Sequence, residues 1–166
     1  MKTNEVYNIK YVDASYSYAK KIDKTELSLH EAYGYVNKSD NNIIITFIKK
    51  KLPKGQEESA LGLVIPDTAL LSYKDDNAKI LADFKIGMSV AVTWRDIVIF
   101  ESSNLRKDCS TMYTEGFLFK IEKDHIVLKN PETIRTYPTP IKNHPINKPS
   151  YCTIPVSFII SITIIK

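Results

Sequence analysis

The chain has 166 residues, of which 43% are hydrophobic and 25% are charged, and its formal net charge is +4. This composition is typical of a globular protein with one or two domains and excludes a disordered chain. The apolar C-terminal stretch 157–166 is shorter than the about 20 residues of a membrane helix, and the first ten residues lack the apolar core of a signal peptide. We therefore expect a cytoplasmic protein that does not associate with membranes.

The first half of the chain predicts a series of strands. A strand over 6–13 alternates apolar and polar residues. A long loop follows, and then a hairpin of strands over 32–38 and 42–49, whose turn holds Asp and Asn residues that tolerate left-handed backbone. A fourth strand over 60–65 ends at Pro66, which has no amide hydrogen and therefore starts a turn of 3₁₀ helix. A last short strand closes the series.

The same elements recur in the second half, which predicts strands over 88–96, 114–121, 125–129 and 151–154. Three pairs of matching residues keep their order at separations of 83, 82 and 89 residues: Asp13 and Asp96, Gly34 and Gly116, and Pro66 and Pro155. The seven extra residues fall in the proline-rich segment 130–150, which we therefore expect to be a surface loop. The repeat predicts an internal duplication.

The order of elements resembles the small five-stranded barrels of the Src-homology-3-like (SH3-like) and Sm-like groups. The segment 62–68, GLVIPDT, is similar to the Gly-x-Ile-Pro segment of the first group, and Gly34-x-Val36 and Gly116-x-Leu118 are similar to the first Sm motif. The paired tryptophans of polyproline-binding domains and the RNA-binding second Sm motif are absent, so neither group's ligand is implied.

The resemblance implies an all-β fold of two tandem SH3-like or Sm-like β-barrels. The expected domains are a first barrel over 1–74, a connector over 75–87 and a second barrel over 88–166. The chain also resembles small uncharacterised proteins of bacteriophages and other prokaryotic genomes. The residues that carry this second resemblance are Val92, Trp94, Asp96, Gly116, Leu118, Ile154, Pro155 and Ser157. It implies a barrel and is consistent with a viral origin, hence with the host cytoplasm, but it implies no activity.

Two aspartates at strand ends are the sharpest site candidates. By the alternation of a strand, Asp13 lies on the side of Tyr11, and Asp96 on the side of Trp94, which should face the core. A buried carboxylate needs a partner. Each Asp therefore either accepts backbone hydrogen bonds from the following loop or, with its aromatic neighbour, forms the mouth of a pocket for a base edge, a ribose or an amine.

Aromatic and basic residues are combined in the loop after the first strand. Tyrosines next to lysines suit stacking on bases while ammonium groups hold phosphates, and ordinary loop packing is the alternative. A lysine run near residue 50 is either a phosphate contact or a solvated strand end. The candidate ligand-binding residues are Tyr16, Tyr18, Lys20 and Lys21, and the candidate phosphate contacts are Lys49, Lys50, Lys51 and Lys54.

Patterns of catalytic, metal and cofactor sites are missing from the sequence. The three histidines are isolated, Cys109 and Cys152 have no metal-ligand spacing, and five glycines form no phosphate-binding loop. We expect no enzyme, no metal and no cofactor. In a reducing compartment the two cysteines are expected to be free thiols, with a disulfide as the alternative.

The sequence therefore predicts a non-enzymatic binding protein. Its mild positive charge and tyrosine–lysine loop favour a nucleotide or single-stranded nucleic acid, which the protein would bind or sequester. The alternative is a protein–protein interaction module that inhibits a host defence protein through the proline-rich loop 131–149, and a minor structural protein is a third reading. Exposed strand edges invite pairing, so we expect a homo-oligomer.

Overall fold

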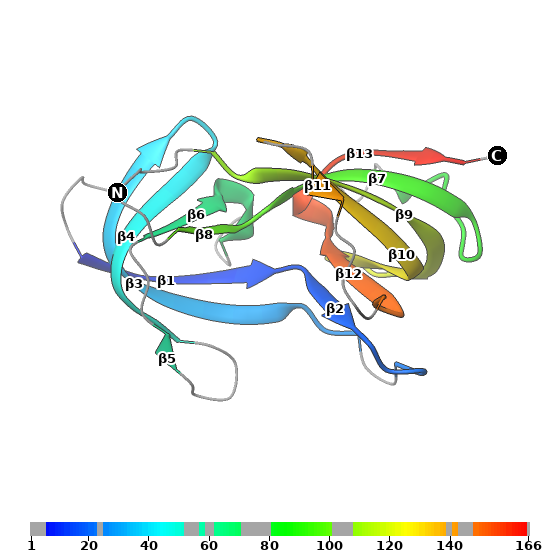
Figure 1. Cartoon of the computed structure of the whole chain (residues 1–166), viewed down its shortest axis with the longest axis horizontal. Coiled ribbons are helices and arrows are strands. Elements are labelled where there is room, and N and C mark those ends of the chain that lie inside the picture. Colours follow the sequence, from blue (N-terminus) through cyan, green and yellow to red (C-terminus); the bar gives the residue numbers. More distant parts are fainter. Residues whose placement is uncertain are drawn as a thin grey trace. The chain divides into compact units, whose positions relative to one another are not determined.

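A computed structural model describes residues 6–22, 25–51, 57–58, 62–70, 81–100, 108–138, 141–142 and 148–165. Across these residues the chain is all-β, as predicted, with a short 3₁₀ helix after each Ile-Pro pair (Figure 1). The same residues contain no helix with the length and apolar character needed to cross a membrane.

The chain forms two compact units, and each unit contains residues from both halves of the sequence. Unit 1 consists of Met1–Asp13, Ser28–Tyr73 and Asp96–Cys109, and unit 2 of Ala14–Leu27, Lys74–Arg95 and Ser110–Lys166. The units differ from the expected domains 1–74 and 88–166, because 14–27 and 96–109 each belong to the unit built mainly from the other half. Within the expected connector 75–87, the described part, 81–87, forms turns.

The sheet of unit 1 is antiparallel throughout. In spatial order it contains β1 (Val6–Asp13), β3 (Ser28–Ser39), β4 (Asn42–Lys51), β6 (Gly62–Pro66) and β8 (Val98–Phe100), and β5 (Glu57–Glu58) pairs with β4. The predicted hairpin is present with longer strands. After β6, η2 (Asp67–Ala69) is the predicted 3₁₀ turn, and Leu70 then forms a bridge to Tyr11 of β1.

The sheet of unit 2 is also antiparallel and repeats this order. In spatial order it contains β13 (Ile159–Ile164), β7 (Ser89–Asp96), β9 (Ser110–Ile121), β10 (His125–Tyr137), β12 (Tyr151–Pro155) and β2 (Ser15–Ser17), and β11 (Ile141–Lys142) pairs with β10. The order β7-β9-β10-β12 matches β1-β3-β4-β6, so the sequence repeat corresponds to a repeated strand order. The helix η4 (Val156–Phe158) matches η2.

The same backbone contact joins each hairpin turn to its 3₁₀ helix. The amide of Asp67 donates a hydrogen bond to the carbonyl of Asn41 (3.0 Å), and the amide of Val156 donates to the carbonyl of Asp124 (2.9 Å). The preceding prolines, Pro66 and Pro155, both have a φ of −57°, close to the angle that the proline ring fixes. In both repeats, the residue after the Ile-Pro pair thus fixes the 3₁₀ helix to the hairpin turn by a backbone hydrogen bond.

Two short strands are exchanged between the halves of the sequence. β2 follows β1 in the chain but pairs with β12 of unit 2, whereas β8 follows β7 but pairs with β6 of unit 1. Val98 of β8 is buried in unit 1 in a cluster with Ile44, Val64 and Cys109. The segments predicted as long loops therefore contain strands, and each strand completes the sheet of the other repeat.

The proline-rich segment 130–150 is only partly a loop, because β10 continues to Tyr137. Asn130, with a φ of 51°, and Pro131 form a bulge opposite Gly116. A Cβ atom on Gly116 would lie 3.1 Å from the Lys129 carbonyl oxygen. The prediction of a loop is thus wrong for 130–137, and the close approach of the bulged strand explains why a glycine occupies position 116.

Candidate functional site

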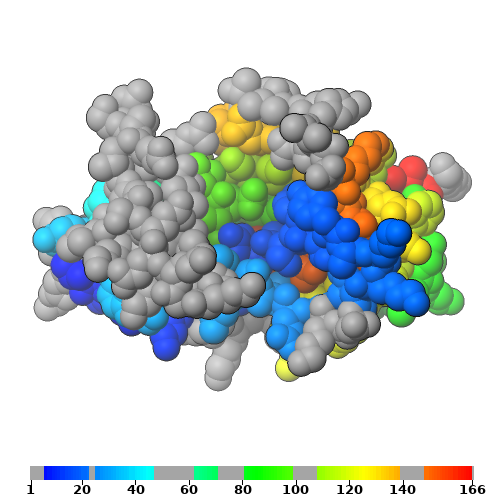
Figure 2. Space-filling model, turned by 60° about the horizontal axis from the view of Figure 1, so that its bottom comes forward, coloured from blue at the N-terminus to red at the C-terminus, as the bar shows by residue number. Residues whose placement is uncertain are grey.

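The segment that follows β2 is held against unit 2. The amide of Ser150 donates a hydrogen bond to the carbonyl of Ser17 (2.8 Å), and the Tyr151 hydroxyl donates to the carbonyl of Lys20 (3.4 Å). Figure 2 shows the blue surface of residues 15–22 against the orange surface of β12. The predicted tyrosine–lysine segment is therefore positioned by a strand from the second half of the sequence.

The four candidate residues of this segment reach the surface. Tyr16 lies opposite Cys152 in the β2–β12 pair and is partly exposed. Tyr18 is 57% exposed, and Lys20 and Lys21 are exposed beside it in the chain. The structure thus brings the aromatic and basic groups of the loop together on unit 2, with their side chains accessible to a ligand.

A second group of exposed aromatic rings lies on β9. Phe117 and Phe119 are 50% and 37% exposed, whereas Leu118 between them is buried, so both phenylalanines lie on the outer face of β9. The register between β9 and β10 shifts at Phe119. Lys129 of β10 lies directly opposite both Phe117 and Tyr151. The Phe119 ring packs against the buried Tyr151 ring, with centroids 5.0 Å apart and an angle of 60° between the planes.

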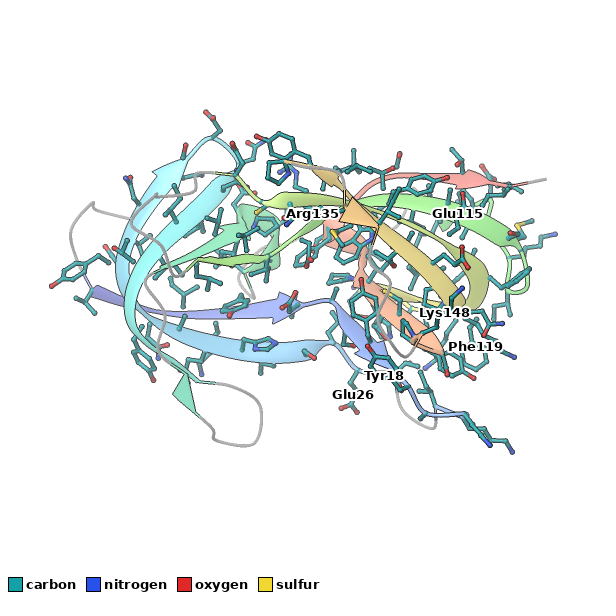
Figure 3. All side chains as sticks on the ribbon, in the orientation of Figure 1. Tyr18, Glu26, Glu115, Phe119, Arg135 and Lys148 are labelled. Carbon is teal, nitrogen blue, oxygen red and sulfur yellow. The ribbon has the colours of Figure 1, made fainter. Side chains whose placement is uncertain are left out.

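Tyr151 connects the two groups, because its ring contacts Phe119 and its hydroxyl bonds the backbone of Lys20. In Figure 3, Tyr18 and Phe119 both lie at the lower side of unit 2. We call the exposed set Tyr18, Lys20, Lys21, Phe117, Phe119 and Lys129 the aromatic–lysine surface. Phe117, Phe119 and Lys129 were not predicted. The sequence feature that could have indicated them is the run GFLFK, residues 116–120, in which three apolar residues are consecutive. A strand with such a run carries apolar residues on both faces.

Three lysines of this surface are available to an anionic ligand. Among the described residues, Lys20, Lys21 and Lys129 form no salt bridge. Lys120 is different, because its ammonium group bonds Glu122 (2.8 Å) and Thr25 (2.9 Å). The hydrogen bond and the charge of Lys120 lower the pKa of the Glu122 carboxyl.

The positive charge of the chain is concentrated in unit 2. Its segments contain fourteen Lys and Arg and nine Asp and Glu residues, a formal charge of +5. The segments of unit 1 contain nine basic and ten acidic residues, a formal charge of −1, and the two values add to the +4 of the whole chain. The unit with the exposed aromatic rings is therefore also the basic unit.

Tyr11 and Asp13 belong to unit 1. The Tyr11 ring is fully buried and stacks on His30, with centroids 5.3 Å apart. Asp13, at the end of β1, is partly buried and pairs in register with Ser28. Tyr11 is thus a core side chain in this structure, on the inward side that strand alternation indicates.

Trp94 and Asp96 end β7. Trp94 is fully buried, and its indole Nε1 donates a hydrogen bond to Oγ1 of Thr114 (2.9 Å). Oδ1 of Asp96 accepts a hydrogen bond from the amide of Ile97 (3.0 Å), which matches the reading in which the carboxylate fixes the following segment. Burial raises the pKa of Asp96 to about 6, against the opposing effect of that hydrogen bond.

The phosphate-contact candidates belong to unit 1. Lys49, Lys50 and Lys51 form the end of β4, in register with Tyr33, Ala32 and Glu31. Lys54 lies outside the described residues.

Cys109 and Cys152 are buried free thiols and do not form a disulfide with each other.

His125 lies beside Asp124, with Nδ1 of His125 2.7 Å from Oδ1 of Asp124. In the described part of the chain, no group of three or more His, Cys, Asp or Glu side chains could hold a metal ion.

Comparison with protein-family models, with curated proteins and with solved structures found no match to this chain.

Proposed function

We propose that unit 2 binds single-stranded nucleic acid through the aromatic–lysine surface. The observation that carries this proposal is the position of Lys129, which has no salt bridge among the described residues and lies directly opposite the exposed Phe117 in the β9–β10 pair. A base can stack on such a ring while the ammonium group holds the adjacent phosphate, and this combination is typical of proteins that bind single strands without sequence preference. The charge of +5 on this unit attracts the same ligand.

The extent of the surface favours a chain of several nucleotides over one nucleotide. Phe117 and Lys129 lie on neighbouring strands, whereas Tyr18 and Lys20 lie in the segment after β2, two strands beyond β10. A single base and its phosphate occupy only one aromatic–lysine pair. A strand of several nucleotides contacts both groups, and each stacked base contributes about 1–3 kcal/mol.

We also propose that each unit is a small barrel of the SH3-like or Sm-like kind. The spatial order β13-β7-β9-β10-β12, with η4 between β12 and β13, supports this in unit 2. Unit 1 has the order β1-β3-β4-β6, and the bridge from Leu70 to Tyr11 places the chain after η2 beside β1, where β13 lies in the other repeat. The exchanged strands β2 and β8 are additions to this pattern.

The test is fluorescence anisotropy with end-labelled 20-nucleotide oligo-dT and oligo-U, titrated with the full chain at increasing NaCl. Phe117→Ala should weaken binding roughly tenfold, because a stacking platform is lost. Lys129→Ala should reduce the salt slope of the binding constant by about 0.7, the contribution of one phosphate contact in a single strand. Tyr35→Ala and Lys10→Ala are the controls, because they remove an exposed tyrosine and an exposed lysine of unit 1. Both variants should leave binding unchanged.

Absence of binding to both oligonucleotides at low salt overturns the proposal and favours a protein ligand instead. Equal losses in the variants of unit 1 and unit 2 also contradict it, because they indicate nonspecific attraction to the whole chain. A mononucleotide is then added as competitor, at the same concentration of nucleotides as the oligonucleotide provides. If it displaces the oligonucleotide, the ligand is a single nucleotide and not a strand.

A further inference from the structure

In the described part of the chain, the sheet of unit 2 has one long edge without a neighbouring strand. β13 lies at the end of the strand order, and among the described residues it pairs only with β7. The opposite end of the sheet, β2, has only three residues. β13 has six residues, with no charge, proline or glycine, and its bulge lies at its start, between Ile159 and Ser161. The segment 161–164 therefore lacks the features by which proteins usually protect an edge from pairing.

The register of β13 shows which backbone groups face outward. The amide of Ile165 donates a hydrogen bond to the carbonyl of Ser89, and the pairs 161–93, 162–92, 163–91 and 164–90 follow without a shift. In an antiparallel ladder, bonded residues alternate with residues whose N–H and C=O point to the other side. The backbone groups of Ile162 and Ile164 therefore point away from β7, symmetrically about Thr163.

The side chains of β13 are also arranged symmetrically about Thr163. Ile162 and Ile164 lie opposite Val92 and Val90, which are fully buried, so the two isoleucines continue the core face of β7 to the edge. Ile164 is nevertheless 54% exposed. Thr163 is exposed on the other face, between the two isoleucines.

We propose that two copies of this chain associate through β13, antiparallel, about a two-fold axis at Thr163. In this arrangement Ile162 of each copy pairs with Ile164 of the other, through four backbone hydrogen bonds, and the exposed isoleucines of both copies form one apolar row. Thr163 meets Thr163, a favourable cross-strand pair. A second copy is the occupant that fits, because a two-fold interface must be self-complementary and the uncharged strand presents no like charges to itself.

The test uses the full chain in size-exclusion chromatography with light scattering. The wild-type protein should have twice the chain mass of 18.9 kDa. Thr163→Lys and Thr163→Glu should each raise the dissociation constant of the dimer at least tenfold, because each substitution places two like charges opposite one another. An equimolar mixture of the two variants should restore the dimer, since a lysine then faces a glutamate.

Ser161→Lys is the matched control. Ser161 is exposed on the same face of β13, but in this register it lies opposite Ile165 of the second copy. The two introduced lysines would be separated by four residues, about 14 Å, beyond the screening length at physiological salt, so this variant should retain the dimer.

A monomeric wild-type protein, or a larger assembly than a dimer, overturns the proposal. The proposal also fails if Thr163→Lys leaves the dimer intact, if Ser161→Lys dissociates it equally, or if the mixed variants stay monomeric. Circular dichroism of each variant establishes that a change of mass is not a loss of fold.

Discussion

The indole Nε1 of Trp94 donates a hydrogen bond of 2.9 Å to Oγ1 of Thr114 in the core of unit 2, and Oγ1 of Thr133 lies 3.0 Å from the same oxygen. Trp94 and Thr114 are both fully buried. The only tryptophan of the chain is therefore anchored to β9 by a polar contact inside an apolar core.

Thr114→Val should lower the free energy of unfolding by about 1–3 kcal/mol, because it keeps the shape of the side chain but leaves the indole N–H buried without an acceptor. Urea titration followed by the fluorescence of Trp94 measures the change. Thr133→Val retains the Trp94 bond and should cost less. Equal losses in the two variants would show that the indole bond contributes little.

Asp96 should make the stability of the chain depend on pH. Its pKa is about 6 in the folded protein and near 3.8 in the unfolded chain, so between these values the folded state binds more protons. The free energy of unfolding then falls as the pH rises from about 4 to about 6 and stays lower above that range.

Asp96→Asn should remove this dependence, because the amide keeps the hydrogen-bond acceptor for Ile97 without the charge. We expect a gain of about 2 kcal/mol at pH 8 and almost none at pH 4, measured by urea unfolding at both pH values. Asp83→Asn, on an exposed turn, controls for the loss of one negative charge. A gain of equal size at both pH values would contradict desolvation of the Asp96 carboxylate as its cause.

The pairing of β2 with β12 can be tested by a disulfide. Tyr16 lies directly opposite Cys152, and directly opposite residues of an antiparallel pair have Cα atoms about 4.5–5.5 Å apart, within disulfide range. Tyr16→Cys should therefore form an intramolecular disulfide with Cys152 under mild oxidation, detected by mass spectrometry of the digested protein.

Ser17→Cys is the control for this disulfide, because neighbouring residues of a strand point to opposite faces. It should leave Cys152 as a thiol. If Cys152 also stayed a thiol in Tyr16→Cys, while circular dichroism remained unchanged, β2 would not be paired with β12 in solution.

Gly116→Ala should destabilise unit 2 by about 1–3 kcal/mol, the usual cost of overpacking a closely packed site. The added methyl group would meet the Lys129 carbonyl oxygen at 3.1 Å and Cβ of Leu128 at 3.2 Å, so the backbone of β10 must move. Thermal unfolding monitored by Trp94 fluorescence provides the measurement. An unchanged midpoint would indicate that the bulge adjusts without cost.

Much of the fold could be predicted because its signals are local. Strand alternation predicted β1 and β7 within one residue, and the missing amide of Pro66 and Pro155 predicted both 3₁₀ turns. The extent of β10 could not be predicted in the same way. Pro131 indicates a loop, but the bulge at Asn130 and Pro131 accommodates the proline within a strand.

The strand exchange could not be predicted because the sequence repeat makes the two possible partners equivalent. β2 and β8 have three residues each, too few for a periodic pattern. Because β6 and β12 occupy equivalent positions in the two repeats, either strand offers a suitable edge, and no local signal chooses between them. For the same reason, only part of the candidate surface could be predicted from the sequence. Tyr18 and Lys20 were recognisable in the sequence, but Phe117 and Lys129 join them only through the exchanged pairing.

The exchange also sets the order in which the protein can be completed as it leaves the ribosome. The edge of β6 stays uncovered until Val98–Phe100 has been synthesised, and β2 has no partner strand until Tyr151–Pro155 has been synthesised. The N-terminal half therefore cannot finish folding as an independent nascent domain. A chain interrupted at its midpoint would carry two unpaired strand edges, a state that chaperones and proteases recognise.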